Sequence, residues 1–122
     1  MTSSSFRDLH VWQDAIKLTT EVYRRTAGFP KHELYGLTNQ MRRAAVSVPS
    51  NIAEGKGHRS DREFTNYLLH ARGSLLELQT QILIARELQY LKPDEGQHLF
   101  DAADAVCRRL NGLINAFRDK AA

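Results

Sequence analysis

The chain has 122 residues, of which 42% are hydrophobic and 25% are charged, and its formal net charge is +3. These values are typical of one globular domain over residues 1–122, and no apolar run approaches the ~18 to 20 residues that cross a bilayer. The N-terminus lacks the pattern of a secretion signal, and the single cysteine, Cys107, cannot form an internal disulfide. We therefore expect a cytoplasmic protein with no membrane partner.

Two helices are predicted in the first half of the chain, over about residues 8–26 and 34–54. Gly28 and Pro30 end the first, and Gly55 and Gly57 follow the second. The face of the first helix that we expect to enter a core consists of Trp12, Ala15, Ile16, Thr19, Val22 and Tyr23.

The second predicted helix contains a proline, Pro49, in its interior. Proline has no N–H for the carbonyl of Ala45, and its ring crowds that turn, at a cost of ~3 kcal/mol in a helix interior. We therefore predict a kink at Pro49. The short polar side chains of Ser47, Ser50 and Asn51 are expected to satisfy the freed backbone groups, with Asn51 as the main support.

A third helix is predicted from a capping box at Ser60 and Glu63 to about residue 88. Apolar residues recur along it at steps of three and four and form the expected seam of a bundle. They are Phe64, Leu68, Ala71, Leu75, Leu78, Ile82 and Ala85. A second row, Leu69, Leu76 and Leu83, is rotated by about 100° from the seam. One core cannot readily cover both rows, so we predict that this second row is an oligomer interface.

A fourth helix is predicted from Pro93, with Asp94 and Glu95 in its first turn. Its expected apolar face consists of Leu99, Ala103, Val106, Leu110, Leu113 and Phe117. Short connections between four helices predict an all-α fold, an antiparallel up-down-up-down four-helix bundle with a proline kink in its second helix. Residues 1–5 and 119–122 are expected to be mobile.

No catalytic, cofactor-binding or metal site is predicted. A di-iron bundle needs two Glu-x-x-His motifs, and only Glu95 and His98 match that spacing. His70, Ser74 and Glu77 share a helical face, but a polar rim beside the seam explains them better than a catalytic triad does. The glycines around Lys56 are better explained as a turn than as a nucleotide-binding loop.

Five basic residues cluster in sequence around the second helix and the turn after it: Arg42, Arg43, Lys56, Arg59 and Arg62. Such a cluster can bind the phosphates of a nucleic acid, and it can equally be a solvated surface.

One long run resembles a known family. The residues YGLTNQMRRAAVSVPSNIAEGKGHRSDREF, followed by the spaced Leu68, Ala71, Gly73 and Glu77, are similar to the bacterial four-helix-bundle family of 23S ribosomal RNA intervening-sequence proteins. The resemblance covers about residues 6–91. The family is similar in turn to the accessory protein of diversity-generating retroelements, a pentameric bundle that binds reverse transcriptase and nucleic acid. This resemblance implies a homopentamer.

The expected function is that of a non-enzymatic, homo-oligomeric scaffold or adaptor. We expect it to bind RNA or a nucleic-acid-processing partner through the basic residues. The alternative is a purely structural, protein-interaction oligomer that binds no nucleic acid.

Overall fold

The computed structural model describes residues 5–121, with side chains as far as residue 118. Four α-helices lie in this part of the chain: α1 (His10–Thr26), α2 (Leu37–Lys56), α3 (Asp61–Glu87) and α4 (Pro93–Ala121), with two short 3-10 helices, η1 (Phe6–Asp8) and η2 (Lys31–Glu33). Of the ends expected to be mobile, residues 1–4 and 122 lie outside the described residues. Ser5 forms a capping box with Asp8 in η1, and α4 continues through residues 119–121.

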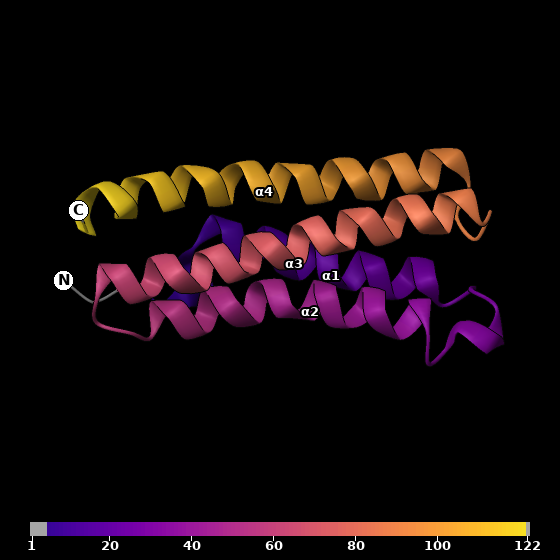
Figure 1. Cartoon of the computed structure of the whole chain (residues 1–122), viewed down its shortest axis with the longest axis horizontal. Coiled ribbons are helices and arrows are strands. Elements are labelled where there is room, and N and C mark those ends of the chain that lie inside the picture. The colour runs from indigo at the N-terminus through magenta and orange to yellow at the C-terminus, as the bar shows by residue number, and fades with distance from the viewer. Residues whose placement is uncertain (1–4, 122) are drawn as a thin grey trace.

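The fold is the predicted four-helix bundle. Figure 1 shows the helices side by side, with successive helices running in opposite directions along the long axis. Close contacts join α1 to α2, α2 to α3, α3 to α4 and α4 to α1, and they join no diagonal pair of these helices. The edge formed by α1 and α2 is therefore opposite the edge formed by α3 and α4. No helix among the described residues has the length and hydropathy of a bilayer-spanning segment.

The predicted seam of α3 forms the middle of the core. All seven of its residues are buried, and Leu68, Leu75, Leu78 and Ile82 have no exposed surface. In α4 the core residues are Leu99, Ala103, Val106, Leu110 and Ile114. Ile114 replaces the expected Leu113, which is half-buried, as is Phe117.

The core face of α1 differs from the expected one. Its buried positions are Val11, Ala15, Leu18, Val22 and Thr26, at steps of four, three, four and four. The predicted core residues Ile16 and Tyr23 instead keep 37% and 43% of their surface exposed. Including Leu18 would have identified the correct face, since Ala15, Leu18 and Val22 follow the coiled-coil spacing and Ile16 lies about 100° away.

Helix α3 begins and ends with local hydrogen bonds. At its start, the Glu63 N–H donates to the Ser60 hydroxyl over 2.9 Å. The second half of the predicted capping box is wrong, because the Glu63 carboxylate lies 2.6 Å from the His58 ring nitrogen instead. At its end, Gln89 adopts a left-handed conformation with φ 64°, and the Tyr90 N–H bonds the carbonyl of Ala85. This turn leads into α4.

Candidate nucleic-acid interface

Pro49 is buried in α2, and the helix continues through it from Leu37 to Lys56. The carbonyl of Ala45 lacks its usual helical donor, because Pro49 has no N–H. The hydroxyl of Thr19, on α1, lies 3.1 Å from this carbonyl oxygen and 2.8 Å from the carbonyl oxygen of Ala15 in its own helix. The donor for the freed group thus comes from a neighbouring helix, and not from α2 as expected. The kink itself stays a prediction.

Asn51 has a different partner from the one expected. Its side-chain amide donates to the carbonyl and to the hydroxyl of Ser47, over 2.8 and 2.9 Å. The Ser47 hydroxyl also lies 2.8 Å from the hydroxyl of Ser74 on α3. Asn51 and Ser47 therefore form a polar contact between α2 and α3, on the side of α2 away from Thr19.

Arg42 is bound within the bundle. Its guanidinium carbon lies 4.7 Å from the centre of the Tyr23 ring, and its Nε donates to the hydroxyl of Thr26 over 3.0 Å. Both partners belong to α1. Arg42 thus connects α2 to the end of α1, which leaves less of its hydrogen-bonding capacity for a phosphate.

Arg43 is exposed and borders a polar groove of about 290 Å³ between α2 and α3. The groove is lined by Gln40, Arg43, Ala44, Ser47, Ser74 and Glu77. No ion pair is found for Arg43 among the described residues. Its guanidinium is therefore available to an anion at the surface.

The other three predicted basic residues lie at one end of the bundle. Lys56 ends α2, Arg59 lies in the connection, and Arg62 is in the first turn of α3. Thirteen residues separate Lys56 from Arg43, which places them about 20 Å apart along the axis of α2. The five residues therefore form two groups and not one continuous cluster. Figure 1 shows the start of α1 and the end of α4 at this same end.

Two carboxylates at this end of the bundle already have side-chain partners. Glu54 accepts a hydrogen bond from the Tyr67 hydroxyl over 3.0 Å, which raises the pKa of Tyr67. Glu63 lies against His58, whose ring stacks on that of Tyr67 with 5.0 Å between the centroids. Lys56, Arg59 and Arg62 make no ion pair among the described residues; Arg59 and Arg62 are exposed, and Lys56 is partly buried.

The second leucine row of α3 is largely outside the core. Leu76 and Leu83 keep 54% and 46% of their surface exposed, and Leu69 is half-buried against the core. Leu76 lies one helical turn from Arg72, which donates to the side chain of Asn111 on α4. It also lies one turn from Gln79, which donates to the Phe100 carbonyl of α4. The row therefore borders α4. About half of the surface of Leu76 and of Leu83 stays open to solvent in the part of the chain that the structure describes.

A second exposed apolar face was missed in the sequence pattern. Tyr23 of α1 and Val46 of α2, which is 40% exposed, line the same surface pocket, and Ile16 lies two helical turns before Tyr23 on the same side of α1. Thr19 locates this face between α1 and α2. It lies one helical turn from Ile16 and from Tyr23, and its hydroxyl contacts Ala45, the residue before Val46. We name this the α1–α2 face and the surface around Leu76 and Leu83 the α3–α4 face.

The residues that share a polar face of α3 have separate partners. Ser74 is paired with Ser47, while the ring of His70 lies against that of Tyr67. Burial raises the pKa of the Cys107 thiol. Residues 5–118, whose side chains are described, include no group of three or more histidine, cysteine and acidic residues that could hold a metal ion.

Comparison with known proteins identifies the family. The model of the 23S rRNA-intervening sequence protein family matches residues 7–112. The chain belongs to this family. A crystal structure of a protein of unknown function from the S23 ribosomal protein family of Bacteroides thetaiotaomicron superposes with a TM-score of 0.77. At 16% identity, over 85% of this chain and 97% of that one, this likeness supports the fold alone. No curated protein matches the chain.

Proposed function

We propose that this member of the 23S rRNA-intervening sequence protein family is a non-enzymatic, homo-oligomeric scaffold that binds RNA or a nucleoprotein partner. The observation that carries the proposal is the exposure of Leu76 and Leu83, at 54% and 46%, on a bundle whose core is filled by another row of α3. Exposed apolar rows of this kind are typical of protein–protein contacts. The resemblance implies five copies.

Nucleic-acid binding is assigned to Arg43, Lys56, Arg59 and Arg62, which have no ion-pair partner among the described residues. A net charge of +3 is modest for one chain. Repetition of the basic residues in an oligomer would raise the affinity through avidity. Arg42 contributes less directly, because it is bound to Tyr23 and Thr26.

Salt-dependent binding to a labelled RNA tests this proposal. Fluorescence anisotropy should show binding that weakens steeply with salt, and each lost phosphate contact should lower the salt slope by about 0.7 to 0.9. The double variant Arg59→Glu with Arg62→Glu should lose binding to the labelled RNA, while its helix content and oligomer mass stay unchanged. Arg42 is unsuitable for this test, since its substitution also breaks a contact between helices.

The matched control is Lys31→Glu with Lys92→Glu, which makes the same charge change at the other end of the bundle. It should keep more of the RNA binding than the first double variant. Equal loss in the two variants would show that only net charge matters. If wild-type protein ignores both single-stranded and structured RNA at low salt, the purely structural, protein-interaction oligomer becomes the better interpretation.

A further inference from the structure

The polar groove between α2 and α3 contains two opposite charges without an ion-pair partner. Its lining includes Arg43 of α2 and Glu77 of α3, and its volume is about 290 Å³. Both residues are exposed, and they pair neither with each other nor with another described residue. We name this site the α2–α3 groove. It offers one positive and one negative charge to a ligand.

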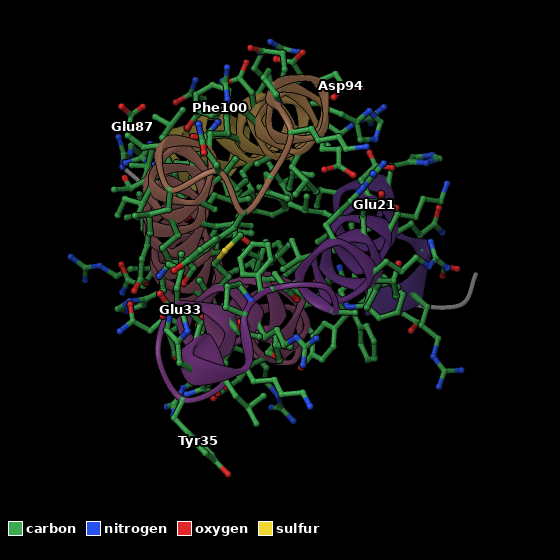
Figure 2. All side chains as sticks on the ribbon, turned by 90° about the vertical axis from the view of Figure 1, so that its right-hand side faces the viewer. Glu21, Glu33, Tyr35, Glu87, Asp94 and Phe100 are labelled. Atoms are coloured by element: carbon green, nitrogen blue, oxygen red, sulfur yellow. The ribbon has the colours of Figure 1, made fainter. Side chains whose placement is uncertain are left out.

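The α2–α3 groove is separate from the basic end of the bundle. Arg43 and Lys56 lie about 20 Å apart along α2. The groove is also on the far side of the bundle from the contact between α1 and α4, because the helices neighbour one another in chain order. Figure 2, which looks along the bundle, shows Glu33, just before α2, and Glu87, at the end of α3, on one side, and Glu21 of α1 on the other.

The two charged residues lie at nearly the same height on opposite walls of the groove. The hydroxyls of Ser47 and Ser74, 2.8 Å apart, fix the register of the two antiparallel helices. Arg43 is four residues before Ser47 and Glu77 is three residues after Ser74, so their heights differ by about 2 Å. An exposed ion pair across such a groove would be weak, so a ligand readily displaces it.

The serines beside Arg43 have one hydroxyl hydrogen without an acceptor. The Asn51 amide donates to the Ser47 hydroxyl over 2.9 Å, and the Ser47 and Ser74 hydroxyls share one hydrogen bond. Two hydroxyls carry two hydrogens, of which this bond uses one. No acceptor for the other is found among the described residues. The groove therefore has a second donor for anionic oxygens close to the guanidinium.

The opposite wall has acceptors that lack donors. Gln81 is only 5% exposed, and its Oε1 is enclosed without a hydrogen-bond donor among the described residues. Its Nε2 lies 3.5 Å from the Glu77 Oε2, so the side chain ends beside the groove. A half-turn of the amide would place two acceptor oxygens next to each other. An ammonium group, with three N–H donors, can serve both.

We propose that the α2–α3 groove binds the zwitterion of a small polar α-amino acid. The ligand carboxylate accepts hydrogen bonds from Arg43 and from the serine hydroxyls, and its ammonium donates to Glu77. A simple anion or cation would leave one of the two charges without a partner. The volume is below that of sites for drug-sized ligands, which favours a short side chain. This inference goes beyond the proposed function and does not depend on it.

A ligand screen on the full-length protein is the first test. Thermal unfolding is measured with each of the common L-amino acids at about 10 mM, where a bound ligand raises the midpoint by mass action. Serine, asparagine or glutamine should raise the midpoint most, and isothermal titration calorimetry should then show saturable binding. If no amino acid binds saturably, the groove holds only water and the proposal is overturned.

Blocked forms of the best amino acid test the two charges separately. Its N-acetyl form lacks the ammonium, and its carboxamide form lacks the carboxylate. Each should bind wild-type protein roughly tenfold or more weakly than the parent, since each loses a charged hydrogen bond. Equal affinity of the parent and the N-acetyl form would make the groove a plain anion site. Equal affinity of the parent and the carboxamide would remove the role of Arg43. Either result overturns the proposal.

Two neutral variants assign the ligand groups to residues. Arg43→Gln should no longer distinguish the parent from the carboxamide, and Glu77→Gln should no longer distinguish the parent from the N-acetyl form. A variant that weakens all three ligands equally would show a merely structural role and overturn that contact. The matched controls, Arg7→Gln and Glu87→Gln, remove exposed charges outside the groove and should keep the wild-type affinities.

The outcomes are distinguishable from those of the RNA experiment. The double variant Arg59→Glu with Arg62→Glu leaves the groove unchanged, so it should bind the amino acid as wild type does. Loss of RNA binding in that variant therefore says nothing against the groove. Failure of the amino-acid titrations, in turn, leaves the RNA proposal intact.

Discussion

Replacing Thr19 by valine should expose the cost of a proline inside α2. Valine has nearly the shape of threonine and no hydroxyl. The substitution therefore removes the donor that lies 3.1 Å from the Ala45 carbonyl and changes the packing little. Because Pro49 supplies no N–H, this carbonyl keeps no helical donor from the residue four positions ahead.

An acceptor that is left unsatisfied away from water costs about 1 to 3 kcal/mol, and partial exposure of Thr19 favours the lower part of that range. We expect a loss of about 1 to 2 kcal/mol, which corresponds to a fall of about 4 to 8 °C in the midpoint of thermal unfolding for a chain of this size. Circular dichroism melts at one fixed protein concentration measure it, since association would otherwise change the midpoint.

The double variant with Pro49→Ala supplies the control. Alanine restores an N–H for the Ala45 carbonyl, so Thr19→Val should cost little in that background, and the two substitutions should be coupled by about 1 kcal/mol. Thr20→Val is a matched single control, since its hydroxyl bonds only a carbonyl of its own helix. Equal costs for Thr19→Val with and without Pro49 would refute the assigned role of Thr19.

Three further substitutions test local features of the bundle. Gly55→Ala should destabilise by about 1 to 3 kcal/mol in chemical denaturation, because an added Cβ would lie 2.5 Å from the Cβ of Tyr67; Gly73→Ala, with open space at its Cβ, should stabilise instead. Glu33 accepts hydrogen bonds from the amide that begins α2 and from Tyr90, and these hold its pKa below the usual range. The stability it contributes is present above its unfolded pKa and is lost as pH falls through the folded pKa. Thermal melts from neutral to acid pH should therefore show that the stability difference between wild type and Glu33→Gln shrinks. A stability difference that stays constant over this pH range would contradict this role.

Much of the architecture follows from local patterns in the sequence. The steps of three and four from Phe64 to Ala85 predict the buried face of α3 correctly, because a helix repeats nearly every 3.6 residues wherever it lies. The exposed leucines of α3 were also predicted, since one helix cannot bury two rows against one core. The connections at Gly28 and at Pro93 follow from backbone preferences of single residues.

The sequence by itself thus determined the helices, their order and the excess of apolar surface on α3. Tertiary structure decided which residues of different helices meet. It placed Thr19 at the carbonyl freed by Pro49, bound Arg42 to Tyr23, and left Ile16, Tyr23 and Val46 together on one edge. Periodicity gives the rotation of each helix about its own axis, whereas these contacts also depend on the height and packing of a neighbouring helix. That relation between helices is absent from any local pattern, and it produced the second exposed apolar face.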